Sequence, residues 1–486
     1  MTGAPRRFPR GAGVVRATLF GLVVDATSLL PPRLRYAYVH RITARLFRRP
    51  LPALLARDRP AASGPAAVTP RRPADLRCVL AADRLDIGGV GAVVEMLATG
   101  LEAQGVHPIV VCLGDGTRAR RLRARGVEVF SVEDERTALA ALRAADPDVI
   151  QLHSAAPALE RLAIAGETPL IPVLHNTEIH LTRARWRAFE TLMHRSYAAI
   201  AVSGVVRDFH RRHVSPALGE RFRVVPNEAP GRNATGHPQR AAARAELGDV
   251  LGVDLAADVV FLCLARYDAQ KNIAGTVASF LRAIDATGVP IRLVVAGEPS
   301  DWAELGRADG IRRSSPHGDR VHLLANSDAA TLLAAADAFL LNSFFEGWPV
   351  AATEALSAGL PLVLSDVGGA RELVARHPDR SVLIPNATGE AGSVTDARVA
   401  RARRRSARQD NAADLIAAVT RVAQLARSDG ASRADPAPAA GSGAGPSGIT
   451  AMMAGHAQII REAHAHARGR RNLIGHDGLT IPGARS

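Results

Sequence analysis

Residues 344–356 read Phe-Phe-Glu-Gly-Trp-Pro-Val-Ala-Ala-Thr-Glu-Ala-Leu, and they follow an apolar run that ends at Asn342. That run has the composition of a buried parallel strand, and Glu346 with Gly347 predicts a loop behind it. Proline suits the start of a helix, where its missing N–H has no bond to lose, so a helix is expected to begin near Pro349. The stretch therefore predicts a strand, a loop and a helix, the repeating unit of a parallel α/β sheet.

The same unit recurs along the chain in two series, separated by a Gly-, Pro- and Asn-rich connection over residues 226–257. The predicted strands are residues 77–81, 108–113, 127–132, 148–152, 170–174, 199–202 and 222–225 in the first series, and 259–265, 291–296, 320–324, 338–342 and 361–364 in the second. Helical spacing lies between most of them. The pattern predicts an α/β protein of two Rossmann-like domains, with the carboxyl ends of both sheets facing a cleft.

Changes in composition set the predicted boundaries. Residues 1–74 are rich in Arg, Pro and Ala and predict a basic extension that is disordered or loosely helical. The two Rossmann-like domains then occupy residues 75–230 and 231–390. Residues 391–448 predict a low-complexity basic insertion containing one helix, and residues 449–486 a C-terminal helix followed by a tail.

The amino-acid composition limits the classes of binding partner that the protein is expected to have. The formal net charge of +14 indicates anionic partners such as nucleotide phosphates, an anionic lipid surface or nucleic acid. Much of the excess lies in residues 1–72 and 401–408, and aromatic residues make up only 4%, which argues against nucleic acid. No segment has the roughly 18 uninterrupted apolar residues of a membrane-spanning helix. Residues 1–74 are expected either to touch an anionic membrane face or to be a plain extension.

The spacing of the cysteines indicates neither a metal site nor a disulfide framework. The chain has three cysteines, each within an apolar run, without disulfide or metal-binding spacing. This usage fits a reducing compartment, so a cytoplasmic protein is expected, with peripheral attachment to the inner membrane face as an option. No metal site is predicted.

Among 61 basic residues, Lys271 is the only lysine. It lies in Leu-Ala-Arg-Tyr-Asp-Ala-Gln-Lys-Asn, residues 264–272, where the first strand of the second series turns into a helix. Chance survival is one explanation; a phosphate pocket too narrow for a guanidinium group is the other. Arg266 and Lys271 together would neutralise a diphosphate at this turn.

The helix that begins near Pro349 would present free N–H groups to the same ligand. Glu354 in its second turn suits ribose hydroxyls, and Glu346 in the loop suits sugar hydroxyls or developing positive charge. A surface loop with an acidic first turn is the alternative explanation for these two carboxylates.

Other candidates belong to the first series. Gly88 and Gly89 follow the first strand and allow close backbone approach to a ligand. His153 and His175 end two further strands. A structural role is an equal alternative for His153.

These motifs resemble the retaining GT-B glycosyltransferases of family 4. That family carries two glutamates separated by seven residues, with Gly, an aromatic residue and Gly or Pro after the first. The matching residues here are Glu346, Gly347, Trp348, Pro349, Val350 and Glu354, together with Arg266, Lys271 and Asn272 upstream. Ala265 replaces the usual Gly before the arginine. The resemblance spans residues 77–386 and implies a GT-B fold with the C-terminal helix crossing back to the first domain.

The resemblance also implies a reaction and its parts. A sugar would pass from a nucleotide-diphosphate donor to a glycan, lipid-linked or small-molecule acceptor with retention of configuration and without a metal or other cofactor. Arg266 and Lys271 would bind the diphosphate, Glu354 the ribose and Glu346 the sugar, with Gly88 and Gly89 beside the donor phosphates and acceptor. His175 would lie near the transferred sugar, and the resemblance makes it and Glu346 the catalytic residues. There are two alternatives. One is another GT-B activity, such as that of a sugar-nucleotide epimerase or phosphorylase, and the other is a non-catalytic anion-binding protein.

Overall fold

The computed structural model describes Ala26 and residues 40–55, 76–85, 88–229, 240–430 and 448–476. These residues form two compact units, and each is described by itself. The N-terminal unit comprises the described residues from 76 to 229 together with 448–476, and the C-terminal unit comprises 40–55 and 240–430.

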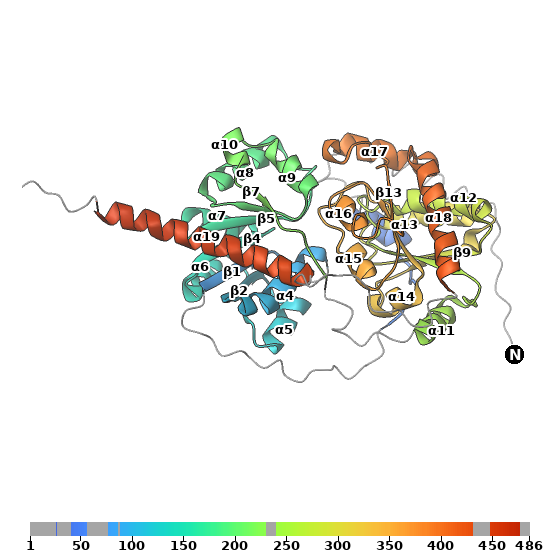
Figure 1. Ribbon diagram of the computed structural model, residues 1–486, viewed down its shortest axis with the longest axis horizontal. Helices are drawn as coiled ribbons and strands as arrows, with labels where there is room; N and C mark the ends of the chain where they lie inside the picture. The colour runs from blue at the N-terminus through green and yellow to red at the C-terminus, as the bar shows by residue number, and fades with distance from the viewer. Residues whose placement is uncertain are drawn as a thin grey trace, which may run out of the picture. The chain divides into compact units, whose positions relative to one another are not determined.

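The N-terminal unit is built on a parallel sheet of seven strands in the order β3-β2-β1-β4-β5-β6-β7 (Figure 1). Its strands are β1 (Leu76–Ala82), β2 (Val106–Leu113), β3 (Glu128–Val132), β4 (Val149–His153), β5 (Leu170–Leu174), β6 (Ala199–Ala201) and β7 (Phe222–Val224). The central strands β4 and β5 are buried along their whole length, because helices cover both faces of the sheet.

The helices of this unit alternate with its strands. They are α4 (Gly89–Gly100), η2 (Leu101–Gln104), α5 (Thr117–Ala124), α6 (Glu135–Ala145), α7 (Pro157–Ala165), α8 (Arg183–Arg195), α9 (Gly204–Arg211), α10 (Pro216–Gly219) and, from the end of the chain, α19 (Gly448–His476). Gly105 ends η2 with φ of 69°, a left-handed conformation that suits glycine. Helix α19 packs on η2, β4 and β5 (Figure 1).

The C-terminal unit has a parallel sheet of six strands in the order β10-β9-β8-β11-β12-β13. Its strands are β8 (Val259–Leu264), β9 (Ile291–Ala296), β10 (Val321–Leu324), β11 (Ala338–Leu341), β12 (Leu362–Ser365) and β13 (Val382–Ile384). Both sheets thus share the doubly wound order in which the strand sequence reverses beside the first strand. The prediction of two Rossmann-like α/β domains is confirmed for each unit.

Helices of the C-terminal unit include several that the sequence pattern did not predict. The full set is α3 (His40–Phe47), α11 (Arg240–Leu251), α12 (Ile273–Thr287), α13 (Trp302–Ser314), η4 (Gly318–Arg320), α14 (Ala329–Ala335), α15 (Val350–Ser357), α16 (Ala370–Val374), η5 (Ala391–Ser393), α17 (Asp396–Arg404), η6 (Ser406–Arg408) and α18 (Ala412–Gly430). Helix α11 lies within the predicted connection, α13 follows β9, and α17 coincides with the basic run.

Two peripheral segments pack closely on the C-terminal unit. In the segment predicted as a basic extension, Leu54 is 1% exposed, and its carbonyl accepts the Asp328 N–H at 2.8 Å. In the segment predicted as an insertion, α18 packs along α12, and the buried Arg403 of α17 pairs with the buried Glu304 of α13.

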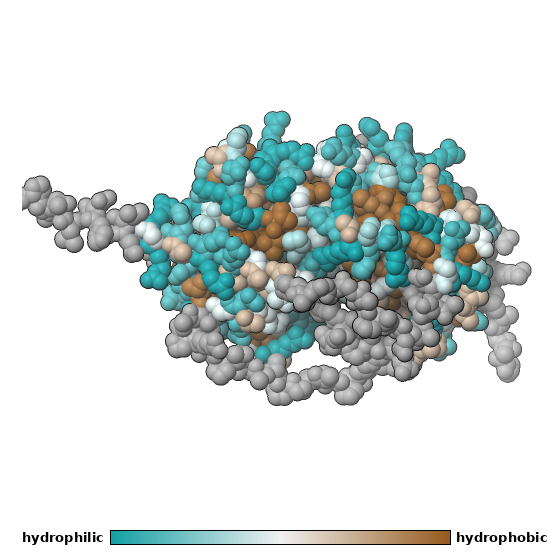
Figure 2. All heavy atoms as spheres, in the orientation of Figure 1, coloured by the Kyte–Doolittle hydropathy of each residue, from teal (hydrophilic) through white to brown (hydrophobic). Residues whose placement is uncertain are grey.

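The surface of both units is mostly hydrophilic on the face shown in Figure 2, with a hydrophobic patch visible on each unit. In the described part of the chain, no helix is long and apolar enough to span a membrane. Cys78, Cys112 and Cys263 are buried free thiols, and burial raises the pKa of Cys78 and of Cys263 to about 12.

Candidate active site

The predicted site residues of the C-terminal unit follow β8 and β11, which are neighbours in the sheet. This pair flanks the topological switch point, where the strand order reverses and where doubly wound sheets bind their ligands beyond the carboxyl ends. Arg266 and Lys271 come after β8, and Glu346 comes after β11. The fold therefore brings two distant sequence motifs to one edge of one sheet.

The two motifs meet in a buried ion pair. Lys271 Nζ lies 2.5 Å from Glu346 Oε1, with the side chains 16% and 6% exposed. Glu346 Oε1 also accepts the Ser343 hydroxyl at 2.7 Å, and its Oε2 accepts Gln270 Nε2 at 3.2 Å. Lys271 and Glu346 thus fix one another, and three donors converge on one carboxylate.

The turn that carries the cations is organised by Asp268. Its Oδ1 accepts the backbone N–H groups of Gln270 and Lys271 at 3.0 and 3.1 Å, and its Oδ2 lies 3.1 Å from Arg266 Nη2. Burial raises the pKa of Asp268, and the charges of Arg266 and Lys271 oppose that rise. The Arg266 side chain is 50% exposed, so its guanidinium group has room to take up an anion.

The loop after β11 is held by close backbone packing. A Cβ on Gly368, which has φ of +51°, would lie 2.4 Å from the Gly347 carbonyl oxygen, and one on Gly369 would lie 2.0 Å from the Trp348 ring. The buried Trp348 donates its Nε1–H to Thr353 in α15 at 2.8 Å. Glycine at both positions therefore lets this segment pack directly against the loop.

Helix α15 begins at Val350, with Pro349 as its N-cap residue, as the prediction of a helix start near Pro349 required. The N-cap side chain makes no capping hydrogen bond, so the first N–H groups of α15 have no side-chain partner at that position. Glu354 is half-buried in the second turn of this helix. A helix start next to paired cations suits an anionic ligand.

Gln409, which no sequence motif marks, holds the turn after Lys271 in place. Asn272, directly after Lys271, has φ of 51°, a left-handed conformation that is strained for a residue other than glycine. Its side-chain amide exchanges two hydrogen bonds with Gln409, at 2.8 and 2.7 Å. Gln409 comes from the end of the basic run, and no periodicity or motif marks it.

The N-terminal unit repeats this arrangement at its own switch point, between β1 and β4. Gly88 is the N-cap residue of α4, with φ of 141°, and Gly89 is the first residue of that helix. The two residues before Gly88 lie outside the described part of the chain. A side chain at Gly88 would be strained by its backbone conformation, although a Cβ there would meet no atom within 4 Å.

The two histidines meet beyond the ends of neighbouring strands. His153 is the last residue of β4 and is fully buried, whereas His175 follows β5 and is partly exposed. His153 Nδ1 lies 3.0 Å from His175 Nε2. Burial lowers the pKa of His175 to about 4 and that of His153 well below its usual value, so both rings are neutral at pH 7.

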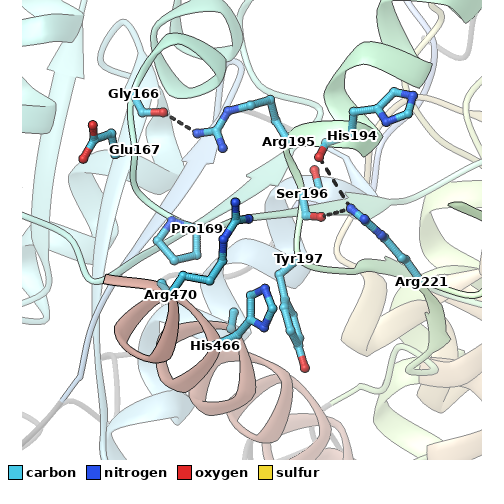
Figure 3. Close-up of a pocket in the computed structure, with 12 residues that line it drawn as sticks. Gly166, Glu167, Pro169, His194, Arg195, Ser196, Tyr197, Arg221, His466 and Arg470 are labelled. Carbon is cyan, nitrogen blue, oxygen red and sulfur yellow. Dashed lines mark hydrogen bonds between the residues drawn. The ribbon is translucent and has the colours of Figure 1, made fainter. Parts of the chain in front are cut away.

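The N-terminal unit also has a cavity of about 460 Å³, which is separate from the candidate site residues of that unit (Figure 3). Its lining residues from the sheet precede β5, β6 and β7, so it opens at the amino-terminal edge and away from the candidate site. Arg195 and Arg221 in its wall donate to main-chain carbonyls, including those of Gly166 and Ser196. These arginines cap helix ends.

The predicted motifs match known families. A family model described as Glycosyltransferase Family 4 matches residues 87–227, and one described as Glycosyl transferases group 1 matches residues 258–397. Together these ranges cover more than half of the chain. The chain belongs to the family 4 glycosyltransferases.

Curated relatives of this family 4 glycosyltransferase include a glycogen synthase of Mycobacterium tuberculosis, 28% identical over 291 residues. Another is the GDP-mannose:cellobiosyl-diphosphopolyprenol alpha-mannosyltransferase of Xanthomonas campestris, 27% identical over 270 residues. These matches cover 55% and 52% of this chain and 65% and 64% of the relatives. The chain therefore aligns with slightly less than two thirds of their length.

Solved structures show the same fold. A glycosyltransferase from Rickettsia africae has a TM-score of 0.57 at 12% identity, covering 80% of this chain and 98% of its own. HepE of Anabaena, solved with UDP and glucose, has a TM-score of 0.54 at 16% identity, covering 73% of this chain and 99% of its own. The GT-B fold of this family 4 glycosyltransferase is thereby confirmed.

No group of three or more His, Cys, Asp or Glu side chains that could hold a metal ion occurs among the residues that the structure describes. The neighbouring acids Asp146 and Asp148 belong to the turn between α6 and β4, where Asp148 accepts the Arg77 N–H at 2.9 Å. Their position before β4 places them at the opposite edge from the candidate site.

Proposed function

We propose that this protein transfers a sugar from a nucleotide-diphosphate sugar to an acceptor hydroxyl with retention of configuration. The observation that carries the proposal is the buried Lys271–Glu346 pair at the switch point between β8 and β11. A diphosphate needs cations and a sugar needs hydrogen-bond acceptors, and this pair supplies one of each within 2.5 Å. The relatives named for glycogen synthesis and mannosyl transfer support the same reaction class.

In the proposed reaction the bond between the sugar C1 and the diphosphate oxygen breaks, and a bond from C1 to the acceptor oxygen forms on the same face. The acceptor proton passes to the departing diphosphate. Arg266 and Lys271 stabilise the negative charge that develops on that leaving group. Glu346 accepts hydrogen bonds from the sugar, and Glu354 accepts them from the ribose.

The N-terminal unit is proposed to contribute Gly88, Gly89 and His175 to the binding of the donor phosphates and the transferred sugar. Gly88 and Gly89 let the start of α4 approach the donor phosphates, because no side chain intervenes. His175, partly exposed beyond β5, contacts the transferred sugar. The bound UDP of HepE supports a nucleotide-sugar donor, which needs no further cofactor in this scheme. The mannosyltransferase relative supports a sugar or lipid-linked acceptor.

Peripheral attachment to the inner membrane face through residues 1–74 belongs to the same proposal. In the described portion of that segment, Ile42 is 57% exposed and Leu55 is 75% exposed, and Arg41 and Arg45 lie on the exposed surface of α3. Exposed apolar and basic side chains together suit an anionic bilayer surface. Co-sedimentation with phosphatidylglycerol vesicles at low and high salt tests this part separately.

The central test is a panel of UDP-, ADP- and GDP-sugars, scored first by thermal shift and then by release of the nucleoside diphosphate with and without added acceptors. We expect one donor to stabilise the protein and Lys271→Ala to abolish that effect. Arg313→Ala is the matched control, because Arg313 lies in the same unit and is 60% exposed. Undiminished donor binding and turnover in Lys271→Ala would refute the site assignment, whereas nucleotide release without a transfer product would indicate an epimerase or phosphorylase.

A further inference from the structure

Four polar side chains form one continuous row in the N-terminal unit, ending at His175. His175 Nε2 meets His153 Nδ1 at 3.0 Å, His153 Nε2 meets Gln151 Oε1 at 3.2 Å, and Gln151 Nε2 meets His456 Nδ1 at 3.2 Å. Gln151, His153 and His456 are all 0% exposed. The row therefore runs from the C-terminal helix α19, through the centre of the sheet, to the predicted acceptor side.

The hydrogen positions in this row follow from its chemistry. Gln151 Oε1 carries no hydrogen, so His153 Nε2 must be the donor in that contact. A neutral imidazole has a single N–H, so His153 Nδ1 must accept, and His175 Nε2–H must donate to it. His175 Nδ1 then carries a lone pair, and it has no partner in the described part of the chain.

The other end of the row is the contact between the Gln151 amide and His456 of α19. His456 Nδ1 lies 3.2 Å from the amide nitrogen of Gln151 and 3.3 Å from its oxygen. With Nδ1 accepting the amide N–H, His456 carries its hydrogen on Nε2, a buried atom with no partner among the described residues. Rotating the amide by half a turn would exchange its oxygen and nitrogen and reverse every hydrogen bond in the row. His175 would then present Nδ1–H instead of a lone pair.

We propose that Gln151, His153 and His456 are positioning residues that set the tautomer of His175, so that α19 determines whether His175 Nδ1 accepts or donates a hydrogen bond. In the present amide orientation Nδ1 is the acceptor and takes a hydrogen bond from a sugar hydroxyl. This role rests on the proposed sugar transfer. The sequence placed His456 only in a terminal helix, and nothing in its spacing connected it with His175.

The experiment uses the full chain labelled with ¹⁵N-histidine, in which ring nitrogen shifts distinguish the two neutral tautomers. The His175 signals are assigned by their loss in His175→Gln. We expect the Nε2–H tautomer in the wild type and a mixture of both tautomers in Gln151→Leu and in His456→Leu. Both variants should lower kcat roughly tenfold with little change in donor affinity, since one oriented hydrogen bond is lost in the reacting complex.

The matched control is His210→Leu. His210 is also a buried histidine of the N-terminal unit, 1% exposed, but its Nδ1 bonds the Val206 carbonyl within its own helix α9. Its loss should leave both the His175 tautomer and kcat unchanged. A double variant of Gln151 and His456 should be no slower than Gln151→Leu alone, because both changes remove the same link.

The tautomer measurement does not need turnover, so it separates this inference from the proposed function. An Nδ1–H tautomer of His175 in the wild type would overturn the inference, as would a pure Nε2–H tautomer in folded His456→Leu. Absence of sugar transfer from every donor would instead refute the proposed function. Circular dichroism and thermal melts confirm that each variant compared is folded.

Discussion

Replacing Lys271 by methionine tests the central ion pair, because methionine keeps most of the side-chain volume and removes the charge. In the folded protein Glu346 would keep its hydrogen bonds from Ser343 and Gln270 but lose its counter-ion. Breaking a buried pair from one side costs about 3–5 kcal/mol. The two surviving hydrogen bonds place the expected loss at the lower end, about 3 kcal/mol.

That loss should be visible as a fall in the melting temperature of the C-terminal unit. For a domain of this size each kcal/mol corresponds to roughly 2–4 °C, so Lys271→Met should melt roughly 6–12 °C lower. The double variant Lys271→Met/Glu346→Gln removes both charges and should recover to within about 1 kcal/mol of the wild type, because no uncompensated buried charge is left.

Activity should behave differently from stability. A cation that stabilises a leaving diphosphate typically contributes about 10²–10³ in kcat, so Lys271→Met should lose that factor. The double variant should regain stability but no activity, because the diphosphate still lacks its cation. Scanning calorimetry and nucleotide release on the wild type, Lys271→Met, Glu346→Gln and the double variant give the full cycle. A double variant that regained turnover, or a Lys271→Met protein with normal turnover, would refute the reasoning.

Three further outcomes follow from the structure. Gln409→Leu removes the two amide hydrogen bonds to the left-handed residue that begins α12, and should weaken donor binding about tenfold in a titration monitored by fluorescence. Gly369→Ala places a Cβ about 2.0 Å from the Trp348 ring and should lower both melting temperature and donor binding, whereas Gly469→Ala, with open space, should change neither. Burial lowers the pKa of His456 to about 3 and of His210 to about 4, below the unfolded value of 6.5, so the unfolded chain binds more protons. Stability should therefore fall as pH drops from 6.5 towards 4, and His210→Leu should show a shallower loss in acid denaturation followed by circular dichroism.

The strands, and the position of the candidate donor-side residues beyond the ends of those strands, were predictable because each depends on local sequence. A buried parallel strand is a short apolar run, and all predicted strands occur in the structure within about two residues of their predicted ends. Arg266, Lys271, Glu346 and Glu354 follow strands, and parallel strands end at a common edge. Helix α13 is different: Gly and Asp interrupt its apolar spacing, so periodicity did not reveal it, although Ala303, Leu305 and Ala308 are buried.

Residues that act through long-range contacts were not predictable in the same way. Gln409 lies 137 positions from Asn272, and His456 lies 305 positions from Gln151. Neither has a recognisable sequence motif around it. An amide or imidazole that holds another side chain needs only to lie next to it in the folded structure, and this requires no particular neighbours in the sequence. Arg403 shows the reverse error: the basic run was predicted to belong to a low-complexity insertion, yet this arginine is buried against Glu304.

The single lysine now has a physical explanation that composition alone could not give. Lys271 is almost enclosed, and its Nζ sits where Glu346, Ser343 and Gln270 already converge. An arginine would place a planar group with five N–H donors into a space that offers one carboxylate oxygen at 2.5 Å, and its remaining donors would be buried without partners. Unpaired buried donors cost about 1–3 kcal/mol each. A chain that uses arginine at every other basic position therefore has a structural reason to keep lysine here, and Lys271→Arg should be less stable than the wild type although it preserves the charge.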